Sequence, residues 1–172
     1  RDFLENEADW VRTTLINEPR GFDAIVGACL CKPEDSTCIT GVVFFNNLSC
    51  LHSCLHGTIG NVETLAYLDR IKPGENHIET PVGIVTALLA EDHSITVKNI
   101  PSYRFAEDVR VTLPDGQKIT GDISWGGNWF FLISNQGPEI RAQNIAALTD
   151  FTKTVRDALH TQNITGENGA KI

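Results

Sequence analysis

Residues 49–60 read SCLHSCLHGTIG, in which the unit SCLH occurs twice and GTIG follows. Beyond it, Val62, Leu65 and Ala66 recur at helical spacing, and with Ile59 they predict an amphipathic helix over residues 57–70. This helix separates two strand-rich stretches of the chain. It also places Cys54 at, or just before, the N-terminus of a helix.

Apolar periodicity predicts the other elements. We expect a helix over residues 2–16, with Asp2 as N-cap and an apolar face of Leu4, Ala8, Val11 and Leu15. A last helix is expected over 144–160, capped by Asn144. Strands are expected over 23–31, 38–45, 77–90, 94–100 and 128–134, and a hairpin over 109–123 with Asp115 and Gly116 at its turn. Residues 101–108 read as a connection. This order predicts an α+β fold with mostly antiparallel strands.

Composition limits the functional class. The chain has 172 residues, 41% of them hydrophobic, which suits a globular protein with a core. No run approaches the ~20 apolar residues of a membrane span. The net charge of −8 disfavours nucleic acid as a partner. There is no methionine, and the C-terminus stops in a predicted turn, so we expect a partial chain.

The five cysteines favour a cytoplasmic protein with reduced thiols, because their number is odd and no signal peptide is visible. Cys50, His52, Cys54 and His56 do not form a good metal site. On a strand they would share one face but span about 20 Å. On a helix the cysteines and the histidines would lie on opposite sides. A two-ligand site completed by a further cysteine stays open, and its candidates are Cys29 and Cys31.

The cysteines in apolar runs, Cys29, Cys31 and Cys38, read as small hydrophobic core residues. A Cys50–Cys54 disulfide suits neither a helix nor a strand. Cys54 differs from the others because a helix begins beside it. Free N–H groups there would lower the pKa of the thiol and could bind a carboxylate. This combination is what removal of an α-proton from an amino acid requires.

At this point the sequence resembles a known family. Residues 54–60, CLHGTIG, resemble the Cys-Gly-His-Gly-Thr-Ile-Gly motif of the proline racemase family. Further segments agree in order and spacing: LINEPRGFDAIVGA (15–28), GVVFFNN (41–47), IETPVGIVTA (78–87), VKNIPSYRF (97–105) and GDISWGGNWFFLIS (121–134). The last segment is most similar to the 4-hydroxyproline 2-epimerases of the family.

The resemblance implies a diaminopimelate-epimerase-like fold, with two similar α+β lobes, each built around a central helix. Residues 1–105 would be most of the first lobe and would carry the Cys54 loop. Residues 106–172 would begin the second lobe. The chain would be about half of a complete member, and its active site would need neither a cofactor nor a metal.

The resemblance also implies roles for individual residues. Cys54 would be a catalytic base, and His56 would set its protonation. Substrate would be bound by backbone N–H groups around His56, Gly57 and Thr58, with Asp122 as a candidate from the second lobe. Two departures stand out: Leu55 replaces the motif's glycine, and the family's downstream Cys-Gly-Thr-Gly-Thr segment, with its second thiol, is missing from these residues.

Three functions follow from the resemblance. The first is a cofactor-independent epimerase or racemase that removes the α-proton of 4-hydroxyproline or proline. The second is a trans-3-hydroxy-L-proline dehydratase, which needs only one base. The third is a non-catalytic, truncated or degenerate member of the family. The partner is a small amino acid rather than nucleic acid or membrane, and a homodimer is the oligomer to consider.

Overall fold

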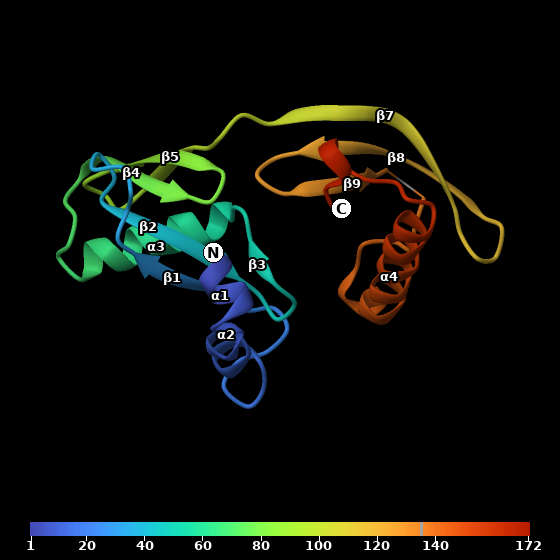
Figure 1. Ribbon diagram of the computed structural model, residues 1–172, viewed down its shortest axis with the longest axis horizontal. Coiled ribbons are helices and arrows are strands. Elements are labelled where there is room, and N and C mark those ends of the chain that lie inside the picture. Colours follow the sequence, from blue (N-terminus) through green and yellow to red (C-terminus); the bar gives the residue numbers. More distant parts are fainter. Residues whose placement is uncertain (135) are drawn as a thin grey trace. The chain divides into compact units, whose positions relative to one another are not determined.

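The computed structural model describes residues 1–134 and 136–172 (Figure 1). The described chain divides into two compact units, Arg1–Ile100 and Pro101–Ile172. Each unit has its own hydrophobic core and is described separately. No helix among the described residues is long and apolar enough to cross a bilayer.

Unit 1 contains three helices and six strands. The helices are α1 (Asp2–Asn6), α2 (Asp9–Ile16) and α3 (Leu55–Tyr67). The strands are β1 (Gly27–Cys31), β2 (Thr40–Phe45), β3 (Cys50–Leu51), β4 (Gly74–Thr80), β5 (Gly83–Leu89) and β6 (Ile95–Lys98). They form one sheet in the order β1-β2-β4-β5-β6, and β3 pairs with β2. Only β2 and β4 are parallel neighbours; the other pairs are antiparallel.

Strand β2 is buried along its whole length because helices cover both faces of the sheet there. Val42 and Phe44 point to one face, where they join the core formed with α3. Val43 and Phe45 point to the other face and pack in a cluster with Ile16 of α2. A continuous apolar run is the expected sequence of a strand with two covered faces.

The N-terminal helix expected over residues 2–16 is in fact two helices, interrupted at Glu7 and Ala8. The break changes which residues face the core: Ala8, Arg12 and Ile16 are buried, whereas Leu15 is exposed. The expected cap was also wrong, since Arg1 rather than Asp2 occupies the N-cap position. The apolar spacing was read as that of one continuous helix, so it could not show that the buried face changes after the first turn.

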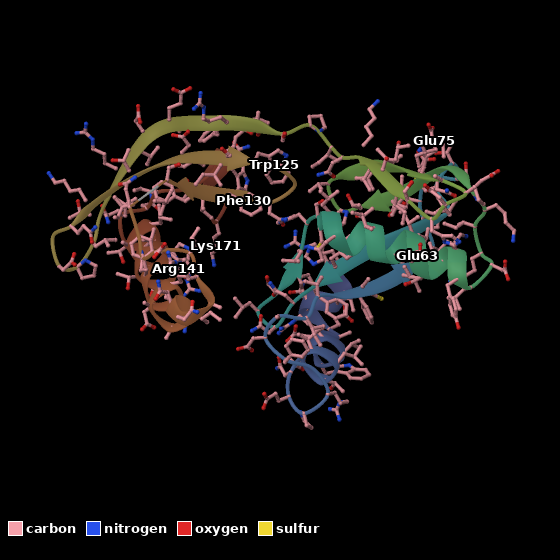
Figure 2. The ribbon with its side chains drawn as sticks, turned by 180° about the vertical axis from the view of Figure 1, so that it is seen from behind. Glu63, Glu75, Trp125, Phe130, Arg141 and Lys171 are labelled. Atoms are coloured by element: carbon pink, nitrogen blue, oxygen red, sulfur yellow. The ribbon has the colours of Figure 1, made fainter. Side chains whose placement is uncertain are left out.

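Unit 2 is a three-stranded antiparallel sheet with one long helix. Its strands are β7 (Tyr103–Thr112), β8 (Lys118–Trp125) and β9 (Trp129–Ile133), in that order. Helix α4 (Ile145–Thr161) packs on one face through Val155 and Leu159. Two 3-10 helices, η1 (Ala142–Asn144) and η2 (Glu167–Gly169), flank α4. Figure 2 labels Trp125 and Phe130, on the strands that form the β8–β9 hairpin.

The expected hairpin turn at Asp115 and Gly116 is confirmed, and Gly116 has φ of +86°, which favours glycine. The connection expected over residues 101–108 is wrong, because β7 begins at Tyr103. Its pairing with β8 is irregular between Arg104 and Val109. Such bulges remove the alternation of apolar and polar residues by which a strand is recognised in a sequence. The predicted α+β class with mainly antiparallel strands is confirmed in both units.

Candidate active site

The first turn of α3 carries the candidate site. The helix begins at Leu55, two residues earlier than expected, and Cys54 is its N-cap residue with extended backbone angles of φ −151° and ψ 109°. Strand β3 leads into this position from its pairing with Phe44 and Phe45 of β2. The sheet therefore fixes where the helix starts, and with it the location of the thiol.

The Cys54 thiol is buried, with 8% of the residue exposed. Its Sγ lies 3.6 Å from Nδ1 and 3.6 Å from Nε2 of His56. Because Sγ is equally distant from the two ring nitrogens, it does not lie along the hydrogen-bonding direction of either one. A directed hydrogen bond would require the ring to rotate. The backbone N–H of Gly57 also donates toward Sγ.

Burial raises the pKa of the Cys54 thiol, and the hydrogen bond from the Gly57 N–H only partly opposes this effect. We expected the helix N-terminus to lower this pKa, and that expectation is wrong for the site as it stands here. The physical reason is that a thiolate loses more solvation on burial than a single N–H group restores. The resting group is therefore the neutral thiol.

Gly57 lets the helix approach the sheet closely. A Cβ added at this position would lie 2.8 Å from the Phe44 ring and 3.1 Å from Cys54 Sγ. Gly60, one turn on, has nothing within 4 Å of an added Cβ. Leu55, which replaces the glycine of the family motif, is half exposed and is the first residue of the helix.

Thr58 lies in the same turn but is fully engaged. Its backbone N–H and its hydroxyl both donate to the carbonyl oxygen of Cys54, each at 2.9 Å. The Gly57 N–H donates toward Cys54 Sγ, whereas the N–H groups of Leu55 and His56 have no partner within the helix. The Leu55 and His56 groups are the ones available for an anion.

Asp122 belongs to β8 of unit 2, whereas Cys54 belongs to unit 1. Its carboxylate accepts hydrogen bonds from Arg104 Nη1, at 3.0 Å, and from the backbone N–H of Asp108, at 3.1 Å. These donors lower the pKa of Asp122, the Arg104 bond most strongly. Its carboxylate is thus an ionised group with partners inside its own unit.

The other cysteines are free thiols. Cys38 is buried, as expected of a small core residue, but Cys31 is exposed and Cys29 only half-buried. The outward placement of Cys31 corrects its assignment to the core, and it follows from the position of β1 at the sheet edge. Among residues 1–134 and 136–172, no group of three or more histidine, cysteine, aspartate or glutamate side chains could hold a metal.

The sequence patterns did not point to Asn61. This residue lies on the buried side of α3 together with Thr58, Val62 and Leu65, whereas Ile59, expected on that side, is exposed. A signal was present, since an asparagine four residues after Gly57 interrupts an apolar helix face. Asn61 and His56 line the same groove, which has a volume of about 570 Å³.

The chain belongs to the proline racemase family, whose model matches residues 1–171. It is 50% identical to a 4-hydroxyproline 2-epimerase of Burkholderia cenocepacia, over all of this chain and 56% of that protein. It is 49% identical to a 4-hydroxyproline 2-epimerase of Acinetobacter baumannii, again over the whole chain and 56% of the relative. The chain thus spans about half the length of the curated relatives it matches.

Two solved structures share its fold. One is a hydroxyproline epimerase from Agrobacterium vitis with bound trans-4-hydroxy-L-proline, with a TM-score of 0.87 and 18% identity. The other is a probable proline racemase from Agrobacterium radiobacter with bound carbonate, with a TM-score of 0.86 and 18% identity. Each match covers 99% of this chain and 54% of the other. The predicted family fold is confirmed.

Proposed function

We propose that this chain is part of a cofactor-independent amino-acid epimerase in which the Cys54 thiol removes the α-proton of 4-hydroxyproline. The observation that carries the proposal is the position of Cys54 at the N-cap of α3, buried, with His56 3.6 Å from its sulfur. The names of the curated relatives support hydroxyproline as the substrate.

The helix N-terminus supplies the anion site in this proposal. The unpaired N–H groups of the first turn, those of Leu55 and His56, would bind the substrate carboxylate. The same groups would stabilise the negative charge that moves onto the carboxylate when the α-proton leaves. The Leu55 side chain is half exposed. Its backbone N–H can donate a hydrogen bond whether the residue is leucine or glycine.

Cys54 must first become a thiolate, because the thiol is neutral at rest. His56 is the nearest side-chain acceptor for its proton, at 3.6 Å. In the forward step the thiol proton passes to the imidazole, the thiolate sulfur takes the α-proton, and the C–H electron pair moves into the carboxylate-stabilised carbanion. Inversion then requires an acid on the opposite face of the α-carbon.

We also propose that unit 1 is most of the first lobe and that unit 2 begins the second. The break between the units, at Ile100 and Pro101, lies a few residues before the boundary expected at 105. Asp122 would then act from the second lobe, and its pairing with Arg104 would keep it ionised when substrate arrives.

The test is α-proton exchange in D2O, followed by NMR. Proline, trans-4-hydroxy-L-proline and trans-3-hydroxy-L-proline would each be offered to the wild type, Cys54→Ser and Cys38→Ser. Cys38 is the matched control, because it is a buried cysteine of the same unit outside α3. We expect exchange on trans-4-hydroxy-L-proline, lost in Cys54→Ser and kept in Cys38→Ser.

Other outcomes are equally informative. Loss of water from trans-3-hydroxy-L-proline would favour the dehydratase. Exchange that survives in Cys54→Ser would rule out Cys54 as the base. Absence of exchange on all three substrates would mean that this chain alone is not catalytic.

A further inference from the structure

A groove runs beside α3 in unit 1, separate from the thiol but sharing residues with its turn. Apolar residues of β1 and the segment before it form one wall, among them Val26, Ala28 and Leu30. Residues between His56 and Thr64 of α3 form the other wall. His56, Asn61 and Thr64 contribute its polar side chains. The Thr64 hydroxyl is already used, because it donates to the Gly60 carbonyl at 2.7 Å.

Asn61 is the unusual member of this groove. Only 6% of the residue is exposed, and its Nδ2 has no hydrogen-bond partner. A buried amide donor without a partner lowers the stability of the folded state, and most such groups in proteins are paired. Asn76, the other buried asparagine of unit 1, shows the usual arrangement, with Nδ2 donating to the Gly74 carbonyl at 2.9 Å.

The geometry of the helix brings the Asn61 amide toward the site. Side chains of an α-helix tilt toward its N-terminus, so Asn61 covers the turn that begins at Gly57. Between these positions, Gly60 leaves open space, because nothing lies within 4 Å of a Cβ added there. The two Cα positions 57 and 61 are separated by about 6 Å along the axis, close to the length of a five-membered ring with a substituent.

We propose that Asn61 is a specificity-determining residue, whose carboxamide donates a hydrogen bond to the ring hydroxyl of the substrate bound at the start of α3. This inference rests on the proposed function. It adds that the ring hydroxyl of the substrate is recognised, and by which residue. With the carboxylate at the first-turn N–H groups and the α-carbon at Cys54, the far side of the ring extends along the groove.

The chemistry of the groove suits a neutral hydroxyl. Apolar walls accept ring methylene groups, and a charged group would lose too much solvation there. The terminal torsion of asparagine is broad and roughly two-fold, so the amide can turn its N–H groups toward a ligand while the helix stays in place. Proline would leave this amide unpaired, whereas hydroxyproline would satisfy it, and that difference generates selectivity.

The experiment measures binding of trans-4-hydroxy-L-proline and of L-proline to the ¹⁵N-labelled chain by NMR titration. The variants are Asn61→Leu, with Asn61→Ala as a smaller replacement, and Asn76→Leu is the control with a paired buried amide. We expect the wild type to favour hydroxyproline about tenfold, the worth of one hydrogen bond. The Asn61 side-chain N–H signals should shift with hydroxyproline and not with proline.

In Asn61→Leu and Asn61→Ala the preference should fall to near unity, while Asn76→Leu keeps it. Thermal stability of Asn61→Leu should rise, since the unpaired donor is gone. The proposal is overturned if the preference survives in both Asn61 variants, or if the wild type binds the two amino acids equally or binds neither.

These outcomes are separate from those of the proposed function. If α-proton exchange depends on Cys54 but the substrate preference does not depend on Asn61, then only the Asn61 inference fails. If the preference depends on Asn61 but no exchange occurs, then the catalytic proposal fails and the recognition site stands.

Discussion

Strands β2 and β9 share an apolar character but have different surroundings. Strand β2 contains the run GVVFF after Thr40, and β9 is the run WFFLI. All six residues of β2 are buried, because α2 and α3 pack on opposite faces of its sheet. Strand β9 alternates: Phe131 and Ile133 pack toward α4, whereas Phe130 is 46% and Leu132 is 54% exposed. An apolar run therefore predicts a strand, but the number of its covered faces depends on the helices around it.

The largest expected difference between the two strands comes from removing one aromatic ring from each. Phe44→Ala should destabilise unit 1 by about 3–5 kcal/mol, because the ring is fully buried beneath α3. Phe130→Ala should change the stability of unit 2 by only about 0.5 kcal/mol. Amide hydrogen exchange of β2 and of β9 would measure each unit separately. Equal losses would show that the outer face of β9 is covered in solution.

The contact between α3 and β2 can be tested at a pair of glycines. Gly57→Ala should destabilise unit 1 by about 1–3 kcal/mol, since its Cβ would press on the Phe44 ring and on Cys54 Sγ. Gly60→Ala, on the same helix with open space at Cβ, should stabilise it by about 0.5–1 kcal/mol through helix propensity. Urea unfolding of both variants measures the difference. Similar effects of the same sign would contradict the close approach at Gly57.

A buried and an exposed arginine extend the comparison to charges. Arg12 binds both carboxylate oxygens of Asp9 and donates to the carbonyls of Asn46 and Asn47 at the end of β2. Arg12→Met should therefore destabilise unit 1 by about 2 kcal/mol.

The control for this variant is Arg104→Met in unit 2. Arg104 is exposed and pairs with Glu107 and Asp122, and because solvent screens such pairs, the loss of stability should be smaller than in Arg12→Met. The same urea titrations measure both variants. A larger loss of stability in Arg104→Met than in Arg12→Met would contradict this prediction. It would show that solvent exposure does not explain the difference between the two arginines.

The smallest effect concerns the thiols of unit 1. Burial raises the pKa of Cys54, so its alkylation should be slow near neutral pH and should accelerate as pH rises beyond the ordinary thiol value of about 8.5. The exposed Cys31 should react faster at every pH, although burial of its sulfur raises its pKa as well. Mass spectrometry of peptides after iodoacetamide treatment measures both rates, and a faster Cys54 would contradict the raised pKa.

The same shift has a consequence for stability. The pKa of Cys54 is higher in the folded state than in the unfolded state. Its contribution to the free energy of unfolding is therefore fully present below the unfolded-state pKa, and it is lost as the pH rises through the folded-state pKa. Stability of the wild type should therefore fall in alkaline solution, and less steeply in Cys54→Ser.

Much of the fold followed from the sequence, because local patterns decide it. The helical spacing after Gly57 predicted α3, and Asp115 with Gly116 predicted the β7–β8 turn that the structure contains. The errors lie where a pattern is interrupted. The N-terminal helix changes phase at Ala8, and the bulges between Arg104 and Val109 hide the first half of β7. Local periodicity carries no information across such breaks.

The candidate site divides in the same way. The sequence by itself determined that a cysteine precedes a helix and that His56 and Gly57 follow it, since neighbouring residues share one turn. Only the tertiary structure decided that Cys54 is buried, that its pKa is raised, that Cys31 faces outward and that Asn61 lacks a partner. Hydrogen bonds within a turn join neighbours in the chain, whereas solvation depends on residues brought from distant parts of it, such as Phe44 of β2 packed against α3.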